Sequence, residues 1–337
     1  MPTSKANESN TTKTKKKNAF FVEGFLKENN LSLINTDKGP VIRGSVVVAV
    51  DEHNTFKIQY YVNKLMKSGE ENKDFADLEA MLPEKTSSVA QYLQNVPTAN
   101  FANASAVATR VWCVGRLEEF CSKSADGKEK SMVTYKASRG GIKTGDTFNP
   151  RATFKIDVYL ESKKPETNSE GDETGRYLLS GLVPAYNGSM YRFSFVTAEG
   201  DPSTYVNDLY DVGQTVYLEG KIMAIRQEVA RSSTKNAGWG TAASLPPRTF
   251  FTTQLVVFGG NTTPINEDEP GAITKKDVKD GLTVRETEAL ENGEKRSSKA
   301  GAAKVTTGTT SFGAEEVTST PVQKAAEPKK SFDFSDF

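Results

Sequence analysis

A tryptophan between two glycines lies in a cation-rich connection of the sequence, residues 226–248. Trp239 stands between Gly238 and Gly240, so its neighbours in sequence cannot bury it. The cations of this connection are Arg226, Arg231, Lys235 and Arg248, and Glu228 is its acidic residue. Exposed rings stack on bases at ~1–3 kcal/mol each, and cations attract phosphates, whatever the base sequence. The composition indicates a site for single-stranded nucleic acid; the alternative is that Trp239 packs on its own loop.

A second cationic stretch covers residues 135–155. Its cations are Lys136, Arg139, Lys143, Arg151 and Lys155, against Asp146 as the acid. Tyr135 and Phe148 add rings to this stretch, and cations interleaved with rings again suit single-stranded nucleic acid. For Lys136 and Lys143 the alternative is an ordinary solvated lysine.

Aromatic residues also follow two predicted strands between residues 177 and 197. Tyr191, Phe193 and Phe195 alternate, so they share one face, which we expect to be core for Phe193 and Phe195. Tyr186 lies in the Tyr-Asn-Gly turn between the strands and is the better candidate for an exposed binding ring.

Catalytic motifs are missing from the sequence. His53 is the only histidine, and no nucleophile elbow, zinc-protease helix or nucleotide phosphate loop is found. Cys113 and Cys121 are the only cysteines, too few for a four-ligand zinc site, and we expect them to be small apolar side chains. We therefore expect no enzymatic activity, no metal and no cofactor.

Length and charge set the remaining limits. The chain has 337 residues, enough for two domains, and its 43 basic and 43 acidic residues cancel, so a basic binding surface must be local. No run approaches the ~18 apolar residues of a membrane span, and the N-terminus lacks the apolar core of a signal peptide. We expect a cytoplasmic protein without membrane contact, in the host cytoplasm if it is viral.

The elements of residues 147–260 come in a recognisable order. Three predicted strands, over 151–162, 176–184 and 189–197, precede a short helix over 201–212 that Gly213 ends, and two more strands follow, over 214–227 and 248–260. Three strands, one helix and two strands is the order of the OB-fold, a five-stranded Greek-key barrel. We therefore predict an OB-fold over 151–260, in which the connection 226–248 borders the binding cleft.

Residues 18–146 are predicted to form a mixed, mostly β domain. The stretches 41–50, 55–62, 106–120 and 131–137 have strand character, and two short helices are expected between residues 75 and 96. The region is a possible second, embellished OB-like domain, although five strands cannot be counted in it. No sequence repeat relates the two regions.

Both ends of the chain are predicted to be disordered. Residues 1–17 form a basic arm, with five lysines against Glu8. Residues 261–337 are net acidic, with 11 basic and 14 acidic residues, and contain at most a marginal helix over 273–290 that Gly281 interrupts. The tail ends in "SFDFSDF", whose rings and carboxylates are Phe332, Asp333, Phe334, Asp336 and Phe337. Such a tip can be captured by a pocket with a basic rim.

An OB-like region followed by an acidic, Phe-terminated tail resembles the single-stranded DNA-binding proteins of bacteria and bacteriophages. The resemblance implies that the tip docks on replication and repair proteins and that it competes with DNA for the cationic cleft. This tip departs from the family pattern, because it lacks the Pro-Phe ending and carries only two acidic residues, Asp333 and Asp336.

Our first hypothesis is therefore a sequence-tolerant single-stranded DNA-binding protein that protects DNA during replication, recombination and repair. It would recruit partner proteins through its C-terminal tip and could form homo-oligomers. The alternative is a viral structural or assembly protein, whose β domains pack against copies of themselves and whose tail is a peptide ligand. A metal-dependent nuclease is a third hypothesis, disfavoured by the shortage of ligands.

Overall fold

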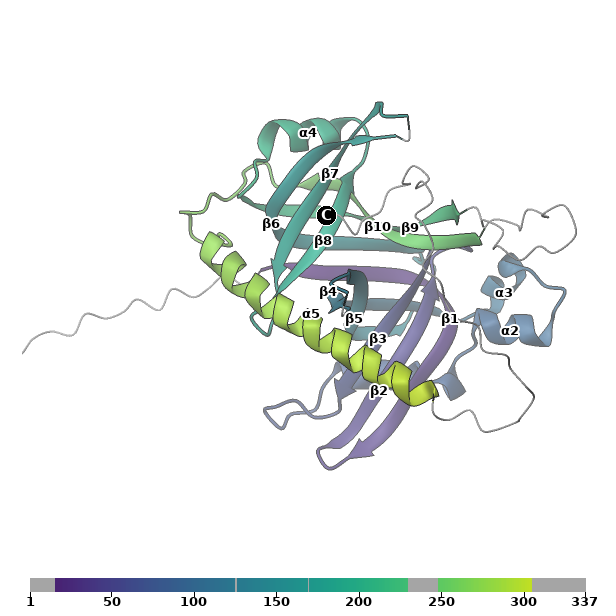
Figure 1. Cartoon of the computed structure of the whole chain (residues 1–337). Helices are drawn as coiled ribbons and strands as arrows, with labels where there is room; N and C mark the ends of the chain where they lie inside the picture. Colours follow the sequence, from purple (N-terminus) through teal and green to yellow (C-terminus); the bar gives the residue numbers. More distant parts are fainter. Residues whose placement is uncertain (1–15, 125, 169, 230–247, 305–337) are drawn as a thin grey trace, which may run out of the picture.

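Two five-stranded barrels follow one another along the chain, and a long helix lies along both of them (Figure 1). The computed structural model describes residues 16–124, 126–168, 170–229 and 248–304, with only the backbone of residues 226–229, 248–251 and 296–304. Within this described part of the chain, no helix is both long and apolar enough to cross a membrane.

The first barrel contains strands β1 to β5. Their bounds are β1 Asn18–Thr36, β2 Gly39–Ala49, β3 Thr55–Asn63, β4 Arg110–Lys123 and β5 Glu129–Ile142. The helices between β3 and β4 are α1 Asp74–Ala80, the short 3-10 helix η1 Pro83–Lys85, α2 Val89–Asn95 and α3 Phe101–Val107. The strands pair in the order β1-β2-β3-β5-β4, β4 returns to β1, and β3 runs parallel to β5.

The second barrel repeats this arrangement with strands β6 to β10. Their bounds are β6 Arg151–Thr167, β7 Glu173–Pro184, β8 Met190–Thr197, β9 Thr215–Val229 and β10 Arg248–Gly260, with α4 Asp201–Leu209 between β8 and β9. The order is β6-β7-β8-β10-β9, β9 returns to β6, and β8 runs parallel to β10. The predicted mainly β fold class with an OB-fold over 151–260 is confirmed, and residues 18–142 have the same strand pairing.

The strand that could not be counted in the first region is β1. Its first half alternates the buried Phe20 and Val22 with outward side chains, whereas its second half contains a polar run in which Glu28 and Asn30 are exposed. The strand curls, because its first half pairs with β4 and β6 and its second half with β2. The predicted strand over 106–120 also begins later, at Arg110, because an Asn100 capping box starts α3 directly before it.

The two barrels share one sheet through the antiparallel pair β1 and β6. Phe20 lies opposite Phe154, and both rings belong to one buried cluster that runs through the two barrels. In each barrel the ring faces a glycine of the fourth strand, Gly115 for Phe20 and Gly220 for Phe154. A side chain at Gly220 would meet the Val256 carbonyl and the Phe154 ring, so only glycine allows this close approach.

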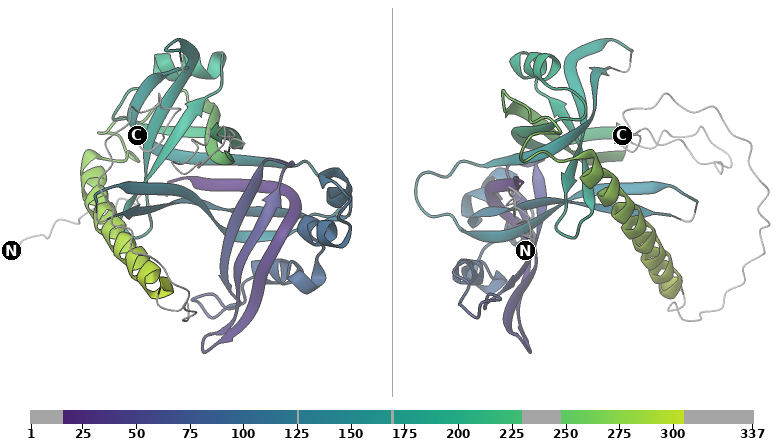
Figure 2. Two further views of the ribbon diagram at one scale, coloured as in Figure 1. Left: turned by 45° about the vertical axis from the view of Figure 1, so that its right-hand side comes forward. Right: turned by 90° about the vertical axis from the view of Figure 1, so that its left-hand side faces the viewer.

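The predicted disordered tail is wrong for residues 261–304. Helix α5, Lys275–Lys304, is continuous and lies along both barrels in every view (Figures 1 and 2). Its buried residues include Arg285 and Ala289, and Gly281 does not interrupt it because this glycine lies against Met190. Tertiary contacts therefore stabilise a helix whose composition alone is unfavourable. Residues 1–15 and 305–337, which include the tip and the predicted arm up to residue 15, lie outside the described part. The last residue of the predicted arm, Lys17, is ordered against the second barrel, because its backbone N–H donates to Asp157 at 2.7 Å.

We expect Gly220→Ala to lower the free energy of unfolding by about 1–3 kcal/mol, the usual cost of overpacking a core. The added methyl group would collide with backbone rather than with a flexible side chain. Urea unfolding followed by circular dichroism measures the change. Gly259→Ala is the matched control, since its new methyl group would meet only the movable Glu219 side chain at 3.2 Å. Equal losses in the two variants would contradict the close approach.

Candidate nucleic-acid interface

The outer side of β2 and β3 in the first barrel carries an open polar surface, called here the first-barrel face. Phe56, Ile58 and Tyr60 of β3 are buried, so the alternating residues between and beyond them point outward. Cross-strand pairing places each outward residue of β3 beside one of β2. The first-barrel face consists of Arg43 beside Tyr61, Ser45 beside Gln59 and Val47 beside Lys57.

The face offers a ring and two cations to solvent. Tyr61 is 67% exposed, an unusual fraction for a large aromatic side chain, and Arg43 and Lys57 are exposed as well. Within the described part of the chain, neither Arg43 nor Lys57 has a carboxylate partner. Their charge is therefore available to an anionic ligand beside a ring that can stack on a base.

The neighbouring strand β5 extends the polar surface of the first-barrel face. Lys136 lies beside Gln59 across the parallel pair of β3 and β5. Its ammonium group contacts the Glu118 carboxylate at 2.5 Å, and Arg116 contacts the same carboxylate at 2.6 Å. Two cations thus share one carboxylate, so this part of the surface keeps a positive balance.

The corresponding side of the second barrel is occupied by α5. Gly181 would direct a side chain into the core, against Val158 and Phe195, so its neighbour Leu182 points outward. Leu182 and Met190, at the hairpin end of β7 and β8, are nevertheless buried. They pack with Ile273, directly before α5, and with residues Val278 and Leu282 of the helix.

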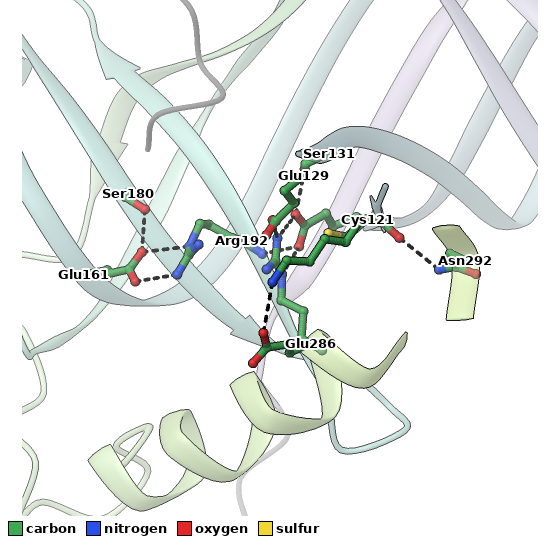
Figure 3. A network of polar contacts seen from close by, with 11 residues as sticks. Cys121, Glu129, Ser131, Glu161, Ser180, Arg192, Glu286 and Asn292 are labelled. Carbon is green, nitrogen blue, oxygen red and sulfur yellow. Dashed lines mark hydrogen bonds and ion pairs between the residues drawn. The ribbon is translucent and has the colours of Figure 1, made fainter. Parts of the chain in front are cut away.

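A polar network holds the other half of α5 on the first barrel (Figure 3). The Arg285 guanidinium donates two hydrogen bonds to Glu119, at 2.6 and 2.9 Å, and one to Glu129, at 2.6 Å. Glu119 also accepts a bond from the Ser131 hydroxyl at 2.6 Å. Both the Arg285 and Glu119 side chains are buried, so removing either one would leave a buried charge without its counter-charge and would destabilise the fold.

The same network reaches the second barrel. The backbone N–H of Arg192 donates to Glu119 at 2.8 Å, and the Arg192 guanidinium donates to Glu161, which also accepts a bond from Ser180 (Figure 3). Arg192 is therefore engaged by protein carboxylates. Two further bonds attach α5, from Lys123 to Glu286 and from the Asn292 amide to the Cys121 carbonyl.

The network changes the acidity of two of its members. Partial burial would raise the pKa of Glu129, but hydrogen bonds from Arg285 and from the Cys121 thiol outweigh it, and this pKa is lowered. Burial raises the pKa of Cys121 to about 12, so its thiol stays protonated at neutral pH. Glu119, Cys121 and Glu129 lie within 4.8 Å of one another, and the Arg285 guanidinium supplies the positive charge beside them.

The predicted cationic stretch 135–155 is divided between different surfaces. Arg139 pairs with Asp74 of α1 at 3.0 Å, away from the other cations. Lys143 and Arg151 come together over Glu23, at 3.8 and 3.9 Å, on the outer side of the junction between the barrels.

The remaining predicted residues have varied positions. Tyr186 is 92% exposed in the β7–β8 turn, as expected, and Phe193 and Phe195 are core residues, as predicted. Arg226 and Arg248 lie near the ends of β9 and β10, where only the backbone is described. The predicted residues outside the described part are Arg231, Lys235, Trp239, Phe332, Asp333, Phe334, Asp336 and Phe337.

Sequence reasoning missed Tyr61, Arg43 and Lys57 as members of a site. The signal was present, because the run Thr55–Val62 alternates apolar and polar residues and places Tyr61 on the polar side. Interpreting it required the OB-fold order of the first region, which depended on the uncounted strand β1.

We expect Glu129→Gln to lower the unfolding free energy at neutral pH by about 0.5–1 kcal/mol, the range for a partly exposed ion pair. Because the folded-state pKa of Glu129 is lowered, the carboxylate stabilises the fold above the ordinary glutamate pKa of about 4.3. This contribution is lost as the pH falls through the folded-state value. Thermal unfolding of both proteins between about pH 7 and pH 3 should show the difference shrinking in acid.

Glu291→Gln is the matched control, since Glu291 is an exposed carboxylate of the same helix with Lys295 as its partner. We expect it to change stability by less than about 0.5 kcal/mol. A Glu129→Gln effect that is as large in acid as at neutral pH would show that the carboxylate charge is not what stabilises α5.

Comparison with known proteins places the chain in a family. No curated protein sequence matches it. Two structures similar to it are of the single-stranded DNA binding protein from Thermus aquaticus. A deletion mutant has 11% sequence identity and a TM-score of 0.41, and the match covers 76% of this chain and 98% of that chain. The wild type has 10% sequence identity and a TM-score of 0.38, and the match covers 74% of this chain and 93% of that chain. The fold assignment rests on strand pairing and not on these matches. The family model described as YorF matches residues 16–296, so the chain belongs to the YorF family.

Proposed function

We propose that this protein binds single-stranded DNA on the first-barrel face. The observation that carries the proposal is the exposed Tyr61 ring, which lies beside Arg43 and shares its strand face with Lys57; neither cation has a carboxylate partner in the described part of the chain. In an OB-fold the second and third strands form the ligand-binding surface, and here these strands are β2 and β3.

The chemistry of the face suits an unpaired strand. An aromatic ring stacks on any base, and Arg and Lys attract phosphates without reading sequence, so binding is tolerant of sequence and falls as salt rises. A duplex would hide the faces of its bases from Tyr61. The proposal therefore favours single strands over double strands.

The second barrel contributes to this site from one end. The backbone N–H of Ala224 in β9 donates to the Asn54 side chain at 2.6 Å, in the turn between β2 and β3. Beyond Ala224, β9 continues to Val229 and pairs with the start of β10 at Arg248. The described ends of β9 and β10, which carry Arg226 and Arg248, thus follow directly after a contact with the turn at one end of the first-barrel face.

The proposed role in the cell is protection of single-stranded DNA during replication and recombination, in the cytoplasm of a bacterium or of a phage-infected cell. Recruitment of replication or recombination proteins is assigned to the C-terminal tip, Phe332–Phe337, where rings and carboxylates alternate on the sequence. No catalytic step is part of the proposal.

We expect Tyr61→Ala to weaken binding of oligo-dT roughly 5- to 150-fold, from the ~1–3 kcal/mol of one stacked base. Fluorescence anisotropy of a labelled oligonucleotide at low salt measures the affinity. The matched control is Tyr205→Ala, another exposed tyrosine, at 53%, which lies on α4 of the second barrel. Its affinity should equal that of the unaltered protein.

The cations are tested by salt titration. Arg43→Gln and Lys57→Gln should each reduce the slope of log affinity against log salt by about 0.7, as expected for one lost phosphate contact on a single strand. The proposal is wrong if the unaltered protein shows no binding of oligo-dT at low salt, or if all three changes in the first-barrel face leave its binding unchanged.

A further inference from the structure

A second outward surface runs across the junction of the two barrels. Because Phe20 and Phe154 share the core side of the β1–β6 pair, the alternate residues of both strands share the opposite side. One row crosses five strands, from β4 to β10: Val114, Phe21, Thr153, Lys221 and Val256. The surface around this row is called the junction face; its charged residues are Lys17, Glu23, Lys143, Arg151, Lys155, Asp157, Glu219 and Lys221.

The junction face is nearly symmetric about the β1–β6 pair. On one side Arg151 lies opposite Glu23, and on the other the Lys17 backbone N–H donates to Asp157 at 2.7 Å. Each half therefore carries one basic and one acidic residue at matching positions. The symmetry follows from the antiparallel pairing of the first strands of two similar barrels.

Aromatic rings position three of these cations. Arg151 lies over the Phe21 ring at 5.1 Å, Lys221 over Phe258 at 5.0 Å and Lys17 over Tyr217 at 4.5 Å. Such contacts hold a cation in place without a counter-charge and leave its donors free for another partner.

The carboxylates of the junction face compensate only part of its positive charge. Glu23 is buried beneath Lys143 and Arg151, at 3.8 and 3.9 Å, distances that are long for ion pairs. The side chain of Lys155 is 65% exposed and has Glu219 at 3.5 Å. Lys221 is exposed, and no carboxylate in the described part of the chain pairs with it. The surface therefore remains positive although the whole chain is neutral.

The junction face is connected to the first-barrel face through one row of the sheet. Gln59 lies beside Lys136, and Lys136 lies beside Arg116. Arg116 directly follows Gly115, the partner of Phe20, so the row continues on β1 at Ala19, the residue before Phe20. Ala19 pairs with Lys155 of β6. Cations thus recur along the row from the first barrel to the second.

The outer side of β7 and β8 in the second barrel is largely unavailable to a DNA strand. Helix α5 occupies the hairpin end of β7 and β8, and Arg192 on this side is held by Glu161. We propose that the junction face is a second track for the phosphate backbone of the same single-stranded DNA, which continues there from the first-barrel face. This inference rests on the proposed function and adds a site made by the first and fourth strands of the barrels.

The test compares oligo-dT of two lengths on the full chain. An oligonucleotide of about 8 nucleotides can be held by one OB-fold, whereas one of about 30 exceeds it. The double variant Lys155→Gln, Lys221→Gln should reduce the salt slope for the long oligonucleotide by about 1.4, the value for two lost phosphate contacts on a single strand, and leave the slope for the short one unchanged. The matched control is Lys276→Gln with Lys279→Gln, two exposed lysines of α5.

Each outcome has a distinct meaning. If the long oligonucleotide binds the double variant with an unchanged slope while Tyr61→Ala still weakens binding, the junction track is wrong and the proposed function stands. If neither oligonucleotide binds any of the proteins, the proposed function fails, and the track fails with it. Equal losses for both lengths would also overturn the track, because the two faces would then be one site.

A second measurement does not depend on a variant. Hydrogen exchange of the unaltered protein should show that the long oligonucleotide slows exchange of backbone amides in β6 and β9, whereas the short one protects β2 and β3 alone. Protection confined to β2 and β3 with both lengths would contradict the track.

Discussion

The β1–β6 pair is the interaction on which the rest of the structure depends. It joins two barrels edge to edge into one ten-stranded sheet, with Phe20 opposite Phe154 on the core side. Because the side chains of a strand alternate, a single core side forces a single outer side, which runs unbroken from one barrel to the other. A slip of one residue in this pairing would place the two rings on opposite sides of the sheet and would divide the surface. The register therefore determines both the core and the outer face.

Two similar barrels have different surroundings. In the second barrel, α5 buries Leu182 and Met190, and a network around Arg285 and Glu119 fixes the helix to the first barrel. In the first barrel the corresponding strands leave Tyr61 exposed. The outer side of the second and third strands is thus open in the first barrel and covered by α5 in the second, although the strand pairing of the two barrels is the same. The difference comes from a helix that follows the second barrel in the chain.

The cations of this neutral chain differ in whether a carboxylate of the protein pairs with them. Glu119 engages Arg285 in the network beneath α5, whereas Arg43 and Lys221 have no carboxylate partner in the described residues. The net charge of zero therefore says little about binding, because a ligand responds to the local cations that the protein itself does not neutralise. Rings under cations, such as Phe21 under Arg151, orient charge without cancelling it.

The sequence by itself determined the class of the fold, because the alternation and turns of residues 151–260 specify strands and one helix in OB-fold order. It also identified Phe193 and Phe195 as core and Tyr186 as exposed. Only the tertiary structure decided that residues 275–304 form a helix, since buried contacts stabilise it against its composition. The faces likewise needed the fold, because Lys155 and Lys221 come to share a face with Phe21 only through pairings between strands far apart in the chain, and local periodicity carries no information about such pairings.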